Sequence, residues 1–231
     1  MEKTLIDYQS AEIYQRELCV LRNINLKVHK GDFIYIVGKV GSGKTSLLKT
    51  IYGELGVRGN CVEVLGYDME TFKRKNIPRL RRRIGIVFQD FQLLTDRTVY
   101  DNLEFVLRAT GWRKQYEIDS RIEEVLEQVG MNDKSYKIPS ELSGGEQQRI
   151  VIARAILNSP LIILADEPTG NLDVETGLAI GELLFNISKV GASVIITTHN
   201  NTLMEQIPGT VYRCEENHSF VKVTQKNTDS E

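Results

Sequence analysis

Eight consecutive residues carry the most specific chemical pattern in the chain. Residues 38–45 read Gly-Lys-Val-Gly-Ser-Gly-Lys-Thr and fit the phosphate-binding pattern G-x-x-x-x-G-K-[ST] at every fixed position. A polyphosphate held at a helix N-terminus needs backbone N–H groups that it can approach closely, and glycine has no Cβ to obstruct it. The residues predicted to surround a phosphate are Gly38, Lys39, Val40, Gly41, Ser42, Gly43, Lys44, Thr45 and Ser46.

Two side chains of this loop have chemistry of their own. Lys44 is placed to reach the β- and γ-phosphates as a point charge, and the Thr45 hydroxyl is placed to bind the Mg²⁺ that bridges them. Residues 33–37 are aromatic and β-branched, as in a strand, and residues 46–51 have helical character. A strand, a glycine-rich loop and a helix in this order predict a nucleotide site.

Two adjacent carboxylates follow an apolar run further along the chain. Residues 161–165 read Leu-Ile-Ile-Leu-Ala, which is typical of a buried parallel strand, and Asp166 and Glu167 come directly after them. Because neighbouring residues on an extended strand point to opposite sides, Asp166 can bind Mg²⁺ while Glu167 orients and polarises a water molecule. The alternative is a pair of solvated acids in a turn, but the apolar strand before them repeats the arrangement at the phosphate loop.

Two more predicted strands deliver polar residues to the same edge of the sheet. Residues 84–88 are followed by Gln89, and residues 194–198 are followed by His199. Open α/β sheets bind their ligands at the carboxyl ends of the strands, so both side chains are expected near Asp166 and Thr45. This shared edge favours a chemical role for His199 over a structural one.

A helix start between these strands contains two glycines that capping does not explain. Ser143 and Glu146 have the spacing of a capping box, which alone marks an ordinary helix start. Gly144 and Gly145 are different, because a helical glycine costs about 1 kcal/mol relative to alanine. The simplest interpretation is that an anion approaches the backbone closely at this helix N-terminus.

The composition limits the class of protein. The chain has 231 residues, 41% of them hydrophobic, and a formal net charge of −2, so a large core is expected and nucleic acid binding is not. The three cysteines lack C-x-x-C spacing, which argues against a disulfide framework and a zinc site. No apolar signal core or membrane-length stretch is present, so work at a membrane would require a partner.

The order of the predicted elements indicates one α/β domain over residues 1–223, followed by a polar tail over residues 224–231. Residues 4–37 predict short strands joined by turns in an antiparallel sheet, and residues from about 90 to 160 predict a helical subdomain inserted in a mostly parallel core sheet. Tyr14 precedes the phosphate loop, where its ring either stacks on a base or packs in the sheet.

Taken together, these motifs resemble the full set of an ABC ATPase domain, which has a P-loop NTPase fold. The resemblance covers nearly the whole chain and rests on the phosphate loop, Gln89, the run Leu142-Ser143-Gly144-Gly145-Glu146, the strand before Asp166 and Glu167, Asn171-Leu172-Asp173 and His199. It implies ATP and Mg²⁺ as cofactors and a head-to-tail homodimer in the ATP-bound state. In that dimer, Ser143 and Gly145 of one subunit would contact the γ-phosphate bound by the other.

The resemblance also implies roles for single residues. Gln89 would bind Mg²⁺ and sense a membrane partner, Glu167 would be the catalytic base, and His199 would contact the γ-phosphate. Asp173 would help to join the two sites across the dimer interface, and Tyr14 would be the aromatic that stacks on adenine. Lys39, Val40 and Asn200 depart from the residues most common in the family without removing a catalytic group.

Within this superfamily, residues 77–102 resemble the cell-division ATPases of the FtsE family. Lipoprotein-release and macrolide-export ATPases usually have a proline after the paired leucines, where this chain has Thr95-Asp96, and lack the segment at residues 96–99. The resemblance implies a cytoplasmic ATPase held at the inner face of the cell membrane by an FtsX-like permease. It would signal to cell-wall hydrolases of the division machinery rather than move a solute.

Two alternatives remain at this point. The chain could be the ATPase subunit of a lipoprotein-release or macrolide exporter, against which the segment at residues 96–99 argues. It could also be a soluble ABC ATPase of translation or DNA repair, but those proteins carry two ATPase units or a long coiled-coil insertion, and this chain has one unit and no such insertion.

Overall fold

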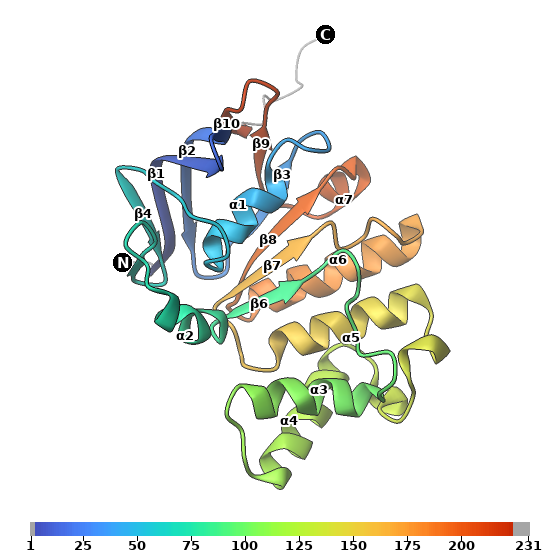
Figure 1. Ribbon diagram of the computed structural model, residues 1–231. Helices are drawn as coiled ribbons and strands as arrows, with labels where there is room; N and C mark the ends of the chain where they lie inside the picture. The colour runs from blue at the N-terminus through green and yellow to red at the C-terminus, as the bar shows by residue number, and fades with distance from the viewer. Residues whose placement is uncertain (1–2, 224–231) are drawn as a thin grey trace.

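Two β-sheets and seven α-helices form the part of the chain that the structure, a computed structural model, describes, residues 3–223 (Figure 1). The larger sheet lies in the middle. Helices cover one of its faces, and the smaller sheet together with two short helices covers the other. The predicted polar tail over residues 224–231 lies outside the described residues.

The larger sheet has six strands in the order β10-β9-β3-β8-β7-β6. All neighbouring strands in it run parallel except β10, which pairs antiparallel with β9. This confirms the mostly parallel core sheet predicted from the apolar runs. The strands are β3 (Phe33–Val37), β6 (Ile84–Val87), β7 (Ile162–Asp166), β8 (Ser193–Thr198), β9 (Thr210–Cys214) and β10 (Phe220–Val223).

The smaller sheet is antiparallel, as predicted, and has the order β2-β1-β4-β5. Its first two strands were expected to be short, but each is a single strand of 12 residues. The prediction was wrong because left-handed residues at Ser10 and Asn23 interrupt the alternation of side chains without ending the strands. The strands are β1 (Thr4–Gln15), β2 (Leu18–His29), β4 (Cys61–Val64) and β5 (Tyr67–Asp68).

Helices α3, α4 and α5 form the layer farthest from the smaller sheet, and α5 lies between α4 and the core sheet (Figure 1). These three helices occupy the region for which the sequence predicted a helical insertion. The helices are α1 (Lys44–Ile51), α2 (Ile77–Arg81), α3 (Val99–Ala109), α4 (Gln115–Gln128), α5 (Gly144–Ile156), α6 (Val174–Lys189) and α7 (Asn201–Gln206).

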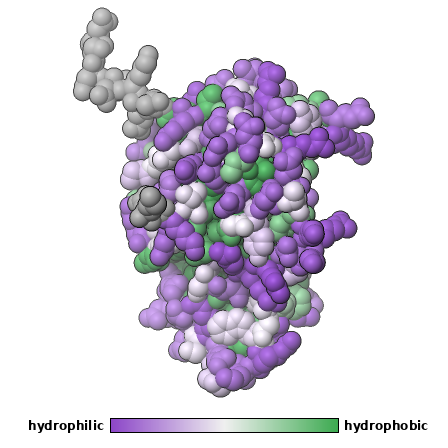
Figure 2. All heavy atoms as spheres, turned by 90° about the vertical axis from the view of Figure 1, so that its left-hand side faces the viewer, coloured by the Kyte–Doolittle hydropathy of each residue, from purple (hydrophilic) through white to green (hydrophobic). Residues whose placement is uncertain are grey.

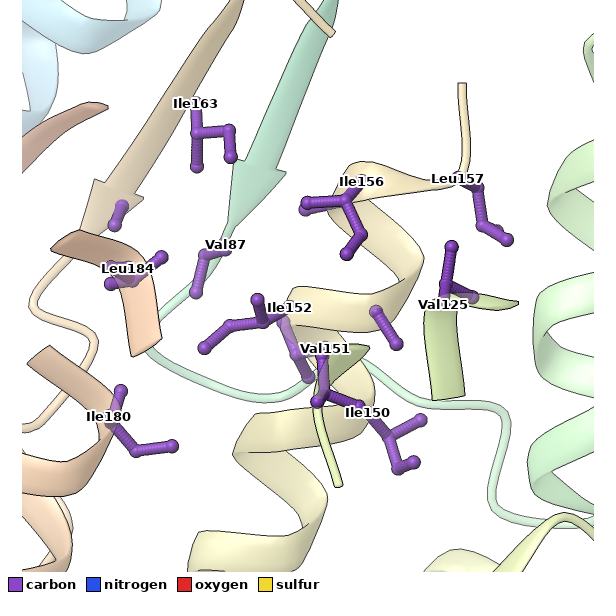
Figure 3. Close-up of a cluster of buried hydrophobic side chains, with 14 of the residues drawn as sticks. Val87, Val125, Ile150, Val151, Ile152, Ile156, Leu157, Ile163, Ile180 and Leu184 are labelled. Carbon is purple, nitrogen blue, oxygen red and sulfur yellow. The ribbon is translucent and has the colours of Figure 1, made fainter. Parts of the chain in front are cut away.

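Two hydrophobic clusters fill the spaces on either side of the core sheet. Along β7, Ile162 and Leu164 belong to the cluster shared with the smaller sheet, whereas Ile163 and Ala165 belong to the cluster shared with the helices. Figure 3 shows part of the helical cluster, with α5 between Val87 of β6 and the neighbouring helix α4. A strand buried on both faces explains the continuous apolar run that precedes the two carboxylates.

Most of the molecular face in Figure 2, which is the left-hand side of Figure 1, is hydrophilic with small apolar areas. Within residues 3–223, no helix is both long and apolar enough to cross a membrane.

The backbones of α5 and β6 approach each other closely at Gly85. A Cβ atom at this position would stand 2.4 Å from the carbonyl oxygen of Ala155, which is closer than real Cβ atoms come to other atoms. Because the obstacle is a backbone atom, a side-chain rotation cannot relieve the clash. Gly85 therefore sets the distance between the helix and the sheet.

We predict that Gly85→Ala lowers the free energy of unfolding by about 1–3 kcal/mol, because α5 has to move away from β6. Urea or thermal denaturation followed by circular dichroism measures this loss. Gly56→Ala is the matched control, since no atom lies within 4 Å of its added Cβ and its φ is not left-handed. Equal stability of the two variants would contradict the close contact.

Candidate functional site

The phosphate loop joins the end of β3 to the start of α1, as the sequence predicted. Gly43 adopts a left-handed conformation with φ of 95°, and a Cβ there would stand 2.9 Å from atoms of Val20 and Leu21. No side chain caps the first turn of α1, so its backbone N–H groups are available to an anion. At Gly41 there is open space where a Cβ would stand. These features suit the close approach of a phosphate.

Lys44 is folded back into this loop. Its Nζ donates to the carbonyl oxygens of Gly38 at 2.9 Å and Lys39 at 3.2 Å, and lies 3.6 Å from Glu167 Oε1. Only 8% of the Lys44 side chain is exposed. A buried ammonium group needs such partners, and a phosphate would be a stronger one than a carbonyl.

Two oxygen ligands of the kind that Mg²⁺ prefers meet between the loop and β7. The Thr45 hydroxyl donates to Asp166 Oδ2 at 2.8 Å, and the Thr197 hydroxyl donates to Asp166 Oδ1. Within residues 3–223 there is no group of three or more His, Cys, Asp or Glu side chains that could hold a metal alone. Nucleotide-bound Mg²⁺ typically takes one or two protein oxygens together with phosphate oxygens and waters, so Thr45 and Asp166 fit that kind of site.

Glu167 does not continue the strand that ends at Asp166. It adopts a left-handed conformation with φ of 47°, which is uncommon for a residue with a side chain, and its N–H donates to Thr197 Oγ1 at 3.0 Å. The expectation that both acids lie on an extended strand is therefore wrong at Glu167. The two carboxylates still diverge, because the turn directs Glu167 toward Lys44 and His199.

His199 follows β8 and meets Glu167 at the edge predicted for it. Its Nδ1 lies 3.0 Å from Glu167 Oε2, and 69% of its side chain is exposed, whereas the Glu167 side chain is only 14% exposed. The carboxylate thus lies between a buried ammonium group and an imidazole that is open to solvent. This position suits a group that acts on a water molecule at the surface of the site.

Gln89 lies beside the turn that follows Glu167. It is exposed after the end of β6, and its Nε2 would be 3.8 Å from a Cβ placed on Gly170. The structure thus brings Gln89 near the carboxylate edge.

The run that begins at Ser143 forms the predicted capping box at the start of α5. The N–H of Glu146 donates to Ser143 Oγ at 3.2 Å, and the N–H of Ser143 donates to Glu146 Oε2 at 2.8 Å. The backbone bond from Ser143, with Lys134 nearby, lowers the pKa of Glu146. No hydrogen bond within residues 3–223 joins Ser143 to the phosphate loop of its own chain, and Ser143 is exposed.

The two glycines of this run have an explanation that the sequence did not reveal. A Cβ at Gly145 would stand 2.5 Å from Thr176 Cγ2 of α6, and one at Gly144 would stand 3.4 Å from Leu172 Cδ2. Packing against α6 therefore gives Gly145 a second reason to lack a side chain. The approach of an anion to the glycine pair stays a prediction.

Asp173 begins α6, where its carboxylate accepts a hydrogen bond from the N–H of Thr176 at 3.0 Å. Hydrogen bonds from the Thr176 side chain and backbone lower the pKa of Asp173. In the single chain, Asp173 thus has the role of a helix cap.

A cavity beside the phosphate loop is lined by residues from three distant parts of the chain. They are Gln15, Leu18, Cys19, Val20, His218 and residues 41–46 of the loop and α1. Tyr14 is absent from this lining. It borders a separate depression, remains 39% exposed and donates its hydroxyl to Glu12 Oε2 at 2.9 Å, so it does not pack inside the sheet. Its stacking on a base stays a prediction.

Two of the remaining predicted phosphate contacts, Lys39 and Ser46, have side-chain partners within the chain. Lys39 forms an ion pair with Glu216, which raises the pKa of Lys39, and Ser46 Oγ accepts a hydrogen bond from Gln15 Nε2 at 3.1 Å. Val40 is 96% exposed. Lys39 and Val40 can therefore meet a phosphate only through their backbones unless the ion pair opens.

Sequence reasoning missed Thr197 and His218. Thr197 had a visible signal, because it is a hydroxyl residue directly before the end of an apolar strand that leads to the site. His218 had none, because its proximity to the loop arises only from the folding of β9 and β10 beside β3.

This combination of fold and site defines the ATP-binding domain of an ABC transporter. The family model described as "ABC transporter" matches residues 21–170. A solved structure of the ATP-binding cassette MJ0796, described as dimeric, in a post-hydrolysis state and bound to ADP and Pi, is 28% identical and superimposes with a TM-score of 0.79. The match covers 97% of this chain and 100% of that one.

Two curated relatives are more similar in sequence, and both are named cell division ATP-binding protein FtsE. The protein of Streptococcus pneumoniae is 40% identical over 84% of this chain and 84% of its own length. The protein of Mycobacterium tuberculosis is 43% identical over 81% of each chain. The chain belongs to the ABC transporter ATPases and, among them, to the FtsE family. It is an ATP hydrolase of the ABC type.

We predict that Thr197→Val lowers ATP turnover about tenfold or more relative to Thr197→Ser. Valine keeps the shape but removes the hydroxyl that donates to Asp166 and accepts from Glu167, and a hydrogen bond to a charged group contributes about 1.5–3 kcal/mol. Phosphate release under saturating ATP measures the effect. Equal turnover of the folded valine and serine variants would rule out this role of the hydroxyl.

Proposed function

We propose that the chain is the ATP-hydrolysing subunit of an FtsE-like membrane complex that acts in cell division. The observation that carries the ATPase part is the convergence of Lys44, Glu167 and His199 beside the Thr45–Asp166 pair, at the ends of three neighbouring parallel strands. The cell-division part is supported by the names of the relatives. Their names give no support to the exporter alternative.

In this proposal, the phosphate loop and Lys44 bind the phosphates of ATP. The N–H groups of the first turn of α1 hold phosphate oxygens, and Lys44 exchanges its carbonyl partners for them. Thr45 and Asp166, with Gln89 approaching from β6, would hold Mg²⁺. When bound, that ion neutralises charge on the phosphates.

Glu167 then acts as the base that accepts a proton from the attacking water. Its Oε1 lies 3.6 Å from Lys44 Nζ, so movement of Lys44 toward the phosphates would release this oxygen for the water. His199 holds the other oxygen through its Nδ1 and fixes the direction of the carboxylate. Its exposed ring is also free to contact the γ-phosphate.

The same proposal includes a head-to-tail dimer in the ATP-bound state. Ser143 and its helix N-terminus are exposed and make no hydrogen bond to the phosphate loop of their own chain among residues 3–223, so a second copy has to supply them to the nucleotide. MJ0796 is described as dimeric, which supports this arrangement. Asp173, next to that helix start, would face the interface.

We further propose that an FtsX-like permease holds the chain at the cytoplasmic, inner face of the membrane. The segment after Gln89 carries three large apolar residues, Phe91, Leu93 and Leu94, which can either line a docking groove or pack as core. Phe91 and Leu93 are partly buried against the main cluster, which favours the core interpretation for these two. Asp96 and Phe105, which is 52% exposed, remain on the surface, and the guanidinium of Arg97, next to Asp96 in the chain, lies 5.6 Å from the centre of the Phe105 ring. Asp96 and Phe105 form the docking surface of this proposal.

We predict that Glu167→Gln keeps ATP binding but lowers hydrolysis by about 100-fold or more, the scale of general-base contributions. An ATP-bound dimer should then accumulate, which light scattering with and without ATP detects. Glu205→Gln, an exposed acid on α7, is the control and should behave as wild type. Wild-type turnover by the Glu167 variant would refute the assignment of the base.

We predict that Asp96→Lys combined with Phe105→Lys abolishes recruitment to membranes and blocks the separation of daughter cells, while the ATP turnover of the purified protein stays within about twofold. Both positions are exposed, so folding should survive. Membrane fractionation and microscopy of cells that express only the variant measure the effect. Val190→Lys, at a residue that is 86% exposed at the end of α6, is the control. Normal recruitment of the double variant would exclude this docking surface.

A further inference from the structure

The hairpin between β9 and β10 lies against the phosphate loop and is held there at several points. Within the turn, the N–H of Glu215 donates to the Ser219 carbonyl at 2.9 Å. The N–H of Arg22 on β2 donates to the His218 carbonyl at 2.8 Å, and Glu216 forms an ion pair with Lys39 of the phosphate loop. The turn therefore has a fixed position relative to the nucleotide site.

His218 lies at the tip of this turn in an unusual conformation. Its φ is 67°, in the left-handed region where residues with side chains are uncommon, and its side chain lines the cavity beside the phosphate loop. Strained residues of this kind concentrate at functional sites, where the surrounding contacts hold them in place. Here the bonds from Arg22 and within the turn provide those contacts.

The hydrogen bond of the imidazole determines what its other nitrogen can do. His218 Nδ1 lies 3.1 Å from the carbonyl oxygen of Val20, and a carbonyl cannot donate, so Nδ1 carries the proton. In the neutral ring, Nε2 is then an acceptor. A ligand group that bonds to the neutral ring is a donor, such as a hydroxyl or an amine.

The cavity has two different walls. One consists of residues 41–46, whose backbone N–H groups and Lys44 suit phosphates. The other consists of Gln15, Leu18, Cys19, Val20 and His218, which offer apolar surface together with the Gln15 amide and the imidazole. With phosphates on the first wall, the second wall meets the part of the ligand that lies beyond them, which in a nucleotide is the nucleoside.

We propose that His218 positions the nucleoside part of the bound nucleotide by accepting a hydrogen bond from a sugar hydroxyl or the base amine. This inference rests on the proposed ATP site and adds a residue from the far end of the chain to it. The loop fixes the phosphates, and the hairpin fixes the other end of the ligand.

The test compares two ligands on the full-length protein. His218→Gly suits the left-handed backbone and removes only the side chain. We expect it to weaken ADP binding about three- to tenfold, the effect of one neutral hydrogen bond, and to leave binding of inorganic tripolyphosphate unchanged. The KM for ATP should rise by the same factor with kcat within about twofold. Ser219→Ala, in the same turn but outside the cavity lining, should change none of these values.

Calorimetry with 2′-deoxy-ATP, which lacks the 2′-hydroxyl, and with ITP, which lacks the base amine, identifies the donor group. His218→Gly should not weaken the binding of the ligand from which that donor is missing. Equal weakening of tripolyphosphate and ADP would overturn the inference, since His218 would then act through the phosphate loop. Unchanged ADP binding would overturn it as well. Should the glycine variant unfold, His218→Asn, which tolerates a left-handed backbone but is too short to reach, gives the same comparison. Wild-type protein that binds no ATP would refute the proposed function itself.

Discussion

The hydrogen bond from Thr45 to Asp166 joins the two halves of the site, which are 121 residues apart in the chain. It exists because β8 lies between β3 and β7 and holds both in register. Val37, the last residue of β3, pairs with Thr198, and Asp166, the last residue of β7, pairs with Thr197. All three strands therefore end at one level. Because the ends of β3, β7 and β8 are aligned, the site brings together the phosphate loop, both carboxylates and His199.

The local motifs could be predicted from sequence because each is a short pattern. Their meeting at the carboxyl-terminal edge of the core sheet could also be predicted, since the motifs follow predicted parallel strands. The phosphate loop, the apolar strand before Asp166 and the capping box of Ser143 are each encoded within about ten residues. What could not be predicted depends on contacts between distant segments. Gly145 packs against Thr176 of another helix, and the left-handed turn at Glu167 lies where its N–H bonds to Thr197 of the neighbouring strand. Tyr14 lies in a depression of its own, which no pattern near it indicates.

The site of one chain has the groups that bind phosphates and polarise water, but its Ser143 helix start is directed to solvent. The proposed head-to-tail dimer would explain this division. The capping box satisfies the Ser143 hydroxyl and the Glu146 carboxylate within the chain, so the helix start keeps its geometry before any partner arrives. The order in the single chain therefore lowers the entropy that assembly has to overcome.

Gly85 brings a helix and a strand together through their backbones, without the layer of side chains that usually separates them. Side chains can change rotamer and absorb small displacements, whereas a backbone contact is stiff. Helix α5 begins at the Ser143 motif, and β6 leads directly into Gln89. A displacement of one motif is thus transmitted to the other with little loss, so the helix and the strand move as one rigid unit between the Ser143 motif and Gln89.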